Sequence, residues 1–309
     1  MDCKHAMKQL ILKALEKRSR NALRHCNAFR VFDGEGEGIP GLAIDNFNGH
    51  WVVQTTGFAD FPDRLREFAG QECESLWWKR LDQHDKKAPL QISGRHSGAP
   101  FLIEENRILY EIDFMAGYSQ GLFLDQRENR ARVGKRLASG QRLLNCFAYT
   151  CGFSVVGAAV GAITTSIDLS RPYLEWGKRN FEANGLPPEE HFFCRGDVFE
   201  WLAQFRKKGR VFTGIVLDPP TFSRTPKKKA VFRVEEDYER LVEMAGALLQ
   251  PDGWMLCCCN EKRMALADFE RQVEGGQQAF GRKETKMKSL QMPFDFNGSN
   301  YLKSIWIDR

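Results

Sequence analysis

The sequence lacks several features that define large classes of proteins. No stretch reaches the roughly 20 uninterrupted apolar residues that a membrane-spanning helix needs, and residues 1–22 are too charged for a signal peptide. The nine cysteines include no C-x-x-C pair, and several lie in apolar runs around 146–151 and 257–259. That usage is typical of reduced thiols rather than of disulfides or a zinc site. We therefore expect a cytoplasmic protein without a metal ion and without membrane contact.

Two further absences concern ligands and order. The chain has no G-x-G-x-x-G loop, which argues against NAD and FAD. Its six histidines are scattered without the spacing of metal ligands. No internal repeat or long low-complexity segment occurs, and 309 residues with 42% hydrophobic and 12% aromatic content can bury one substantial core. The composition predicts a globular chain with room for a smaller second domain.

Basic residues are clustered in short runs, although they outnumber acidic residues only slightly. The formal net charge is only +5, but basic residues gather at 206–210, 224–229 and 283–288. Such runs are usually solvated surface. Three of them in the second half nevertheless make a polyanion partner plausible, because contacts to phosphates supply most of the non-specific affinity for nucleic acids.

Residues 1–117 predict a small α+β domain. A basic amphipathic helix is expected within residues 1–22, because apolar residues recur there at helical spacing. Short β-rich runs punctuated by Gly, Pro and Asn follow at 29–56 and indicate antiparallel strands with tight turns. A helix at 60–73, a strand at 75–81 and a hairpin at 101–110 complete this part of the prediction.

From residue 118 to residue 309 the pattern predicts an open α/β sheet of the Rossmann-like type. Apolar strands alternate with helices, as in βαβ units. The final two runs are expected to form an antiparallel pair. The predicted strands are Arg142–Ala148, Thr164–Leu169, His191–Asp197, Phe212–Asp218, Gly253–Cys259, Glu284–Met292 and Tyr301–Asp308, with helices that include Pro172–Asn184 and Glu236–Leu249.

Ligands of such sheets bind beyond the carboxyl ends of the strands, so the residues that end each strand carry most weight. The first strand ends in a loop with a single glycine. The second ends at Asp168, where a carboxylate can accept hydrogen bonds from both hydroxyls of a ribose, and the third at Asp197 and Val198, which suit an adenine amino group and ring face. This order favours an adenosyl ligand without phosphates. The candidate cofactor-binding residues here are Asn145, Phe147, Tyr149, Gly152, Phe153, Asp168, Leu169, Ser170, Asp197 and Val198.

The fourth strand ends in Asp218-Pro219-Pro220-Thr221-Phe222-Ser223. Two prolines hold the backbone extended and offer no N–H, so the carbonyls beside them are available as acceptors. A carboxylate and a carbonyl there can accept hydrogen bonds from a base amine while Phe222 stacks on the ring. The plainer interpretation of residues 218–223 is a turn that ends the strand. However, the position of this segment at the carboxyl edge of the sheet favours a catalytic role for Asp218, Pro219 and Phe222.

These residues resemble the class I RNA methyltransferases that contain the bacterial large-subunit ribosomal RNA enzymes making 5-methylcytosine and, in a sister branch, 7-methylguanine. The most specific stretches are 121–130, 144–154 and 217–223, with 33–54 similar to the family's second domain. The resemblance implies a seven-stranded methyltransferase sheet with a smaller β-rich domain, S-adenosylmethionine as cofactor and an RNA base, in ribosomal RNA, as substrate. It also implies that the first-strand loop holds the methionine part, Asp168 the ribose and Asp197 the adenine, and that the cofactor lies beside Asp125, Gln126 and Arg127.

Three departures from the family pattern bear on mechanism. The cytosine enzymes usually begin with an RNA-binding PUA domain, and a basic helix stands in its place here. Cys151 occupies a position where many relatives have glycine, which is tolerable if the turn does not require positive φ. Cys259 lies where the cytosine enzymes carry the cysteine that adds to the base, but buried cysteines are often inert, and the continuation through Asn260 to Arg263 looks more like the guanine branch.

The acceptor therefore stays open between a guanine nitrogen and carbon 5 of cytosine. In either case the base must be flipped out or lie in a loop, because a paired base cannot reach the methyl group. Candidates for holding the RNA are Phe222, the run Lys227–Lys229 and the N-terminal helix. Other hypotheses are a methyltransferase of a small molecule or protein, and a non-catalytic RNA-binding protein with a Rossmann-like domain.

Overall fold

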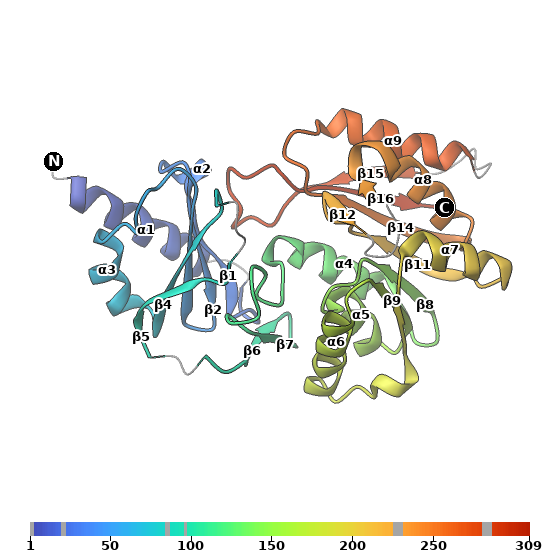
Figure 1. The fold of residues 1–309 in the computed structure, drawn as a ribbon, viewed down its shortest axis with the longest axis horizontal. Helices are drawn as coiled ribbons and strands as arrows, with labels where there is room; N and C mark the ends of the chain where they lie inside the picture. The colour runs from blue at the N-terminus through green and yellow to red at the C-terminus, as the bar shows by residue number, and fades with distance from the viewer. Residues whose placement is uncertain (1–2, 20–22, 84–86, 96–97, 225–230, 280–285) are drawn as a thin grey trace. The chain divides into compact units, whose positions relative to one another are not determined.

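The computed structural model describes residues 3–19, 23–83, 87–95, 98–224, 231–279 and 286–309. The chain forms two compact units, Met1–Arg127 with Pro293–Ser299, and Glu128–Met292 with Asn300–Arg309. Figure 1 shows the course of the chain through both. Among the described helices, none has the length and apolar character needed to cross a membrane. Each unit is built around its own sheet.

The first unit contains a five-stranded sheet in the order β1-β2-β3-β4-β5. Neighbouring strands are antiparallel except β3 and β4, which run parallel. Ile11 and Ala14 of α1, with Leu65 and Phe68 of α3, pack against one face of this sheet. The elements are α1 (Cys3–Ser19), β1 (Ala28–Asp33), α2 (Gly34–Glu37), β2 (Leu42–Phe47), β3 (His50–Thr55), α3 (Arg64–Glu72), β4 (Ser75–Arg80), β5 (Leu90–Gly94), the hairpin β6 (Phe101–Glu105) and β7 (Ile108–Ile112), and the 3-10 helix η1 (Leu124–Gln126).

A buried ion pair assigns a late segment of the chain to this first unit. Arg127 donates two hydrogen bonds to Asp295, at 2.5 and 3.0 Å, and their side chains are 2% and 0% exposed. The Asp295 carboxylate also accepts from the backbone N–H of Arg30, and Arg18 donates to the Asp295 carbonyl. Sequence patterns place the domain boundary after residue 117. The compact first unit runs to Arg127 and takes in Pro293–Ser299, and the ion pair of Arg127 with Asp295 is one of the contacts within it.

The second unit is built on a seven-stranded sheet in the order β10-β9-β8-β11-β14-β16-β15. The first five strands in this order are parallel, and β16 is antiparallel to both of its neighbours. The predicted fold class is confirmed, down to the final antiparallel pair. The strands are β8 (Arg142–Cys146), β9 (Ile163–Asp168), β10 (Phe192–Arg195), β11 (Phe212–Leu217), β14 (Leu249–Cys259), β15 (Lys286–Leu290) and β16 (Lys303–Asp308), with a short pair β12 (Phe222–Arg224) and β13 (Val231–Arg233) beside them.

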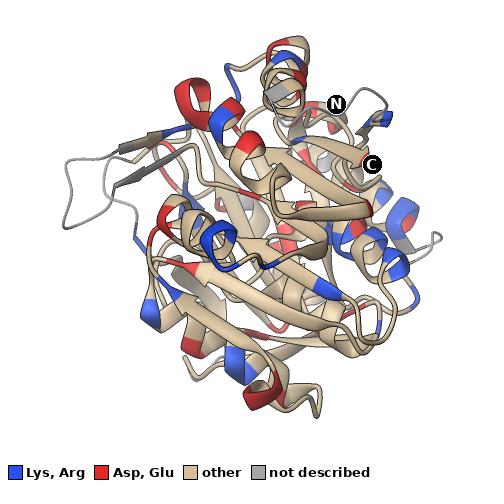
Figure 2. Cartoon of the chain, turned by 90° about the vertical axis from the view of Figure 1, so that its right-hand side faces the viewer, with Lys and Arg blue, Asp and Glu red and all other residues tan. Residues whose placement is uncertain are grey.

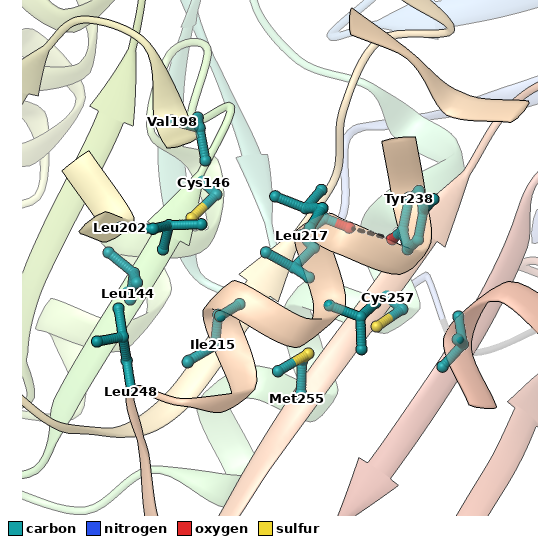
Figure 3. Close-up of a cluster of buried hydrophobic side chains, with 14 of the residues drawn as sticks. Leu144, Cys146, Val198, Leu202, Ile215, Leu217, Tyr238, Leu248, Met255 and Cys257 are labelled. Atoms are coloured by element: carbon teal, nitrogen blue, oxygen red, sulfur yellow. Dashed lines mark hydrogen bonds between the residues drawn. The ribbon is translucent and has the colours of Figure 1, made fainter. Parts of the chain in front are cut away.

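Helices cover both faces of this sheet. Residues of α7, α8 and α9 pack on one face and residues of α4 and α5 on the other. The helices are α4 (Arg127–Arg136), α5 (Gly152–Ala159), α6 (Arg171–Ala183), the 3-10 helix η2 (Pro188–Glu190), α7 (Val198–Lys207), α8 (Val234–Gly246) and α9 (Leu266–Ala279). Figure 3 shows part of the first of these two cores. The strand β11 is buried along its whole length, which explains its continuous apolar sequence.

Candidate active site

The carboxyl ends of five parallel strands meet along one edge of the sheet in the second unit. Chain order reverses at β8, which lies between β9 and β11, and such a switch point is where open α/β sheets bind ligands. Asp168, Asp218 and Cys259 stand at or directly after the ends of β9, β11 and β14. The fold therefore brings the candidate residues of this unit to one edge.

The loop after β8 has an unusual backbone. Phe147, Tyr149 and Cys151 have φ of +59°, +49° and +63°, in the left-handed region that side chains other than glycine seldom adopt. Such conformations cost roughly 1–3 kcal/mol each and concentrate at functional sites. The sequence alone allowed Cys151 on the condition that the turn needs no positive φ. The turn does need it, so Cys151 is held there by its surroundings.

Three buried polar contacts supply that support. The Asn180 side chain on α6 donates to the carbonyl of Thr150 at 2.9 Å. Asn145 donates to Ser154 at 3.0 Å, and the Ser154 hydroxyl lies 2.7 Å from that of Ser166. Asn145 is 1% exposed, so its amide ties the start of α5 to β8 from within, and the Ser154–Ser166 contact ties α5 to β9. Asn180, Ser154 and Ser166 are not among the predicted residues. The sequence feature that could have identified them is a polar residue at a position where the pattern of the helix or strand predicts an apolar one.

Asp168 links the end of β9 to the loop after β8. Its carboxylate accepts hydrogen bonds from the backbone N–H groups of Tyr149 and Ser170, both at 2.8 Å. Burial raises the pKa of this carboxyl even though backbone hydrogen bonds from Ser170, Tyr149 and Leu169 lower it. A carboxylate has about four lone-pair sites, so the three backbone hydrogen bonds leave Asp168 capacity to accept one from a hydroxyl group of a ligand.

The other residues at this edge have identifiable contacts. Ser170 caps the N-terminus of α6 by accepting from Tyr173, and Asp197 caps α7 by accepting from Glu200. Val198 is 3% exposed and packs in the core. Leu169 and Gly152 are half-buried, and Phe153, in the first turn of α5, is buried in the core. Nothing in these contacts tests a cofactor role, which stays a prediction for each of them.

Aromatic rings flank the loop after β8 on two sides. Tyr149 meets Tyr173 edge to face with ring centroids 4.6 Å apart, and lies 6.4 Å from Trp176. Phe147 lies 5.5 Å from Phe232. Aromatic pairs in such arrangements contribute about 0.5–1.5 kcal/mol beyond area burial. They make the loop a rigid, partly apolar surface beside Asp168.

The turn after β11 is anchored from both sides. The Tyr238 hydroxyl donates to the carbonyl of Leu217 at 3.1 Å, as Figure 3 shows. The Thr221 hydroxyl donates to the side-chain oxygen of Asn260 at 2.9 Å, which joins this turn to the loop after β14. Between these anchors Asp218 is half-buried and Pro219 is buried. The backbone of Phe222 starts β12, but its side chain and the run Lys227–Lys229 lie outside the described residues.

Cys259 is 0% exposed at the end of β14. Its sulfur lies 3.7 Å from that of Met264, and the residue belongs to the core formed with α7, α8 and α9. Burial raises the pKa of the Cys259 thiol. A nucleophilic cysteine needs access and thiolate character, and the site supplies neither.

The remaining cofactor candidates belong to the first unit, and one basic run of the second unit lies away from the carboxyl edge. Asp125, Gln126 and Arg127 belong to the first unit, where Arg127 holds Asp295. The run Arg206–Arg210 covers the end of α7 and leads into the start of β11, so it lies at the opposite edge of the sheet from Asp218. Figure 2 shows acidic and basic segments interspersed across this side of the chain. The basic run at 206–210 therefore does not mark the carboxyl edge.

A family of S-adenosylmethionine-dependent methyltransferases matches residues 81–279. The chain belongs to this family. S-adenosylmethionine is accordingly the cofactor of this methyltransferase, and the sequence resemblance that implied it is confirmed.

Named relatives are similar over most of the chain. The ribosomal RNA large subunit methyltransferase K of Neisseria meningitidis is 37% identical over 219 residues, which are 71% of this chain and 58% of the relative. A ribosomal RNA large subunit methyltransferase of Deinococcus radiodurans is 30% identical over 298 residues, 91% of this chain and 72% of the relative. The chain thus spans less than two thirds of the Neisseria relative. A crystal structure described as a methyltransferase complexed with SAH has a TM-score of 0.87, at 28% identity over 99% of this chain and 82% of that one.

The residues present fit an adenosyl cofactor. Asp168 is a half-buried carboxylate with acceptor capacity to spare, set beside a rigid loop with aromatic side chains. No glycine-rich loop follows β8 to admit a pyrophosphate. This donor set suits a ligand with a ribose and no phosphates.

Proposed function

We propose that this methyltransferase modifies a base of large-subunit ribosomal RNA and that the acceptor atom is a guanine nitrogen. The names of the relatives support the substrate class. The burial of Cys259 carries the choice of base. Carbon 5 of cytosine is a poor nucleophile and needs a covalent adduct with cysteine, whereas a guanine nitrogen attacks directly. A ribosomal RNA substrate also supports a cytoplasmic location.

The cofactor supplies an electrophilic methyl group, so the protein must position the acceptor and exclude water. We assign Asp168 to the ribose and Asp197 and Val198 to the adenine. The loop from Asn145 to Phe153 holds the methionine part, and Leu169 and Ser170 complete the ribose pocket. By resemblance, Asp125, Gln126 and Arg127 line the same ligand.

Asp218 and the Pro219 carbonyl would receive the base. A guanine presents N–H donors on its Watson–Crick edge, and a carboxylate and a carbonyl side by side are matching acceptors. A negative charge at Asp218 would also stabilise the positive charge that develops on the ring as its nitrogen is alkylated. Phe222 would stack on the same base. The tertiary anchors at Leu217 and Thr221 keep this turn in place without a ligand.

The decisive experiment is methyl transfer from radiolabelled S-adenosylmethionine to large-subunit ribosomal RNA, followed by nucleoside analysis. The proposal expects labelled methylguanosine from wild type and from Cys259→Ala alike. If wild type instead yields labelled 5-methylcytidine and Cys259→Ala yields none, the acceptor is cytosine and the proposal of guanine is wrong. Label in protein or small molecules but not in RNA would favour the other methyltransferase hypothesis. Binding of RNA without any transfer would favour a non-catalytic protein.

A further inference from the structure

A lysine opposite Cys259 is buried at the same edge of the sheet. Lys303 begins β16, and its Cα is the antiparallel partner of the Cα of Cys259 on β14. Directly opposed residues of antiparallel strands point to the same face. Lys303 therefore shares the face of Ile305 and Ile307, which pack in the core with α8 and α9. It is only 7% exposed.

The Lys303 ammonium binds backbone carbonyls rather than a carboxylate. Its Nζ donates to the carbonyl of Glu261 at 2.5 Å and to that of Tyr301 at 3.1 Å. Within the described part of the chain it forms no ion pair. Burying an ammonium is costly unless it is paired or hydrogen-bonded. The two carbonyls stabilise the buried ammonium, and the ammonium in turn fixes the two backbone segments that carry them.

What it holds is the loop that follows β14. Glu261 is the second residue after Cys259, and its carbonyl also accepts from the backbone N–H of Met264. The neighbouring Asn260 accepts the hydrogen bond of Thr221. A continuous link thus runs from the buried Nζ of Lys303 through the loop to the turn that carries Asp218 and Pro219.

We propose that Lys303 is a positioning residue for methyl transfer, which fixes the Asp218 turn through Glu261, Asn260 and Thr221. The inference rests on the proposed role of Asp218 in receiving the base. Lys303 is assigned no contact with the cofactor, because the link joins β16 to the loops after β14 and β11, whereas Asp168 ends β9. Loss of the link should therefore slow the transfer step and leave cofactor affinity intact.

The test compares Lys303→Met, Lys303→Arg and Lys135→Met with wild type. Lys135 is exposed near the end of α4, so its variant removes the same charge away from the link. Lys303→Met should lower kcat for ribosomal RNA by about 10- to 100-fold, as expected for a displaced reacting group. Its Kd for S-adenosylhomocysteine by calorimetry should stay near that of wild type, Lys303→Arg should recover part of kcat, and Lys135→Met should match wild type.

Unchanged kcat in Lys303→Met would overturn the inference, and so would a parallel loss of S-adenosylhomocysteine binding. If Lys303→Met does not fold, Thr221→Val tests the exposed end of the same link, and an unchanged kcat there would also overturn it. Amide hydrogen exchange of residues 260–264 needs no substrate and should be faster in Lys303→Met than in Lys135→Met. If the wild-type protein shows the expected hydrogen exchange and binds S-adenosylhomocysteine but methylates no RNA, the proposed function is refuted. The hydrogen exchange would still show whether Lys303 fixes residues 260–264.

Discussion

Gly177 on α6 leaves the space that the side chain of Cys151 occupies. A Cβ built on Gly177 would lie 2.4 Å from the Cys151 sulfur and 2.9 Å from its Cβ. The cysteine stands in a turn with φ of +63°, a conformation that glycine adopts more readily than any residue with a side chain. The missing side chain at 177 thus accommodates the extra one at 151, which is how the loop after β8 keeps its shape.

Substitutions at positions 177 and 151 should have coupled effects on stability. Gly177→Ala forces a methyl group against Cys151 and should destabilise the protein by about 1–3 kcal/mol, as overpacking does. Cys151→Gly in the same chain removes the clash and suits the positive φ, so the double variant should recover most of the loss. Chemical denaturation of all three variants measures the coupling. Additive effects would contradict the packing relationship.

Binding of S-adenosylhomocysteine should depend on pH through Asp168. Burial raises the pKa of this carboxyl, so it takes up a proton at higher pH than an ordinary aspartate. Since hydroxyl groups bind the carboxylate form, affinity should be full above the raised pKa and fall as pH decreases through it. Calorimetry across the acidic range checks this, with Asp168→Asn as the variant that should lose the pH dependence.

The same raised pKa has the opposite consequence for the stability of the unliganded protein. A raised folded-state pKa means that the folded state favours the neutral acid, so this contribution is present at low pH and lost as pH rises through the folded pKa. Asp168→Asn cannot titrate, so its stability should lose this dependence on pH, and it should bind S-adenosylhomocysteine about 10- to 100-fold more weakly, the loss expected for charged hydrogen bonds. A variant that keeps the pH dependence of stability and binds normally would contradict both expectations.

Asp218→Asn should separate methyl transfer from cofactor binding. The variant keeps the shape of the turn but removes the charge, and loss of one stabilising group of this kind costs about 10²- to 10³-fold in kcat. Calorimetry with S-adenosylhomocysteine should give the wild-type Kd. Full activity in Asp218→Asn would show that the base is held elsewhere.

Asp295→Asn should destabilise the first unit. Removing one partner of a buried ion pair leaves Arg127 uncompensated, which typically costs about 3–5 kcal/mol. Thermal unfolding measures the loss, and Arg136→Ala, which breaks the exposed pair with Asp308, serves as the control with an expected cost below about 1 kcal/mol. Equal effects of the two variants would show that burial of the Arg127 pair is unimportant.

The sequence determined the fold class, the order of strands and helices in the second unit, and the cofactor. Apolar runs and turn residues are local signals, so strands such as β8 and β11 were predicted to within two residues at their ends. The acids at 168, 197 and 218 could be placed at one edge because parallel strands end on the same side. The resemblance at 121–130, 144–154 and 217–223 then gave the family.

Only the tertiary structure decided which of these residues has which surroundings. Burial of Cys259, the positive φ of Cys151 and the space above Gly177 depend on residues distant in the chain, and no local pattern encodes them. The ion pair of Arg127 with Asp295 and the link from Lys303 to Asn260 likewise join separate segments. Local periodicity specifies helices and strands, whereas exposure, pKa and hydrogen-bond partners arise from packing. These packing-dependent properties distinguish a positioning residue from a reacting one.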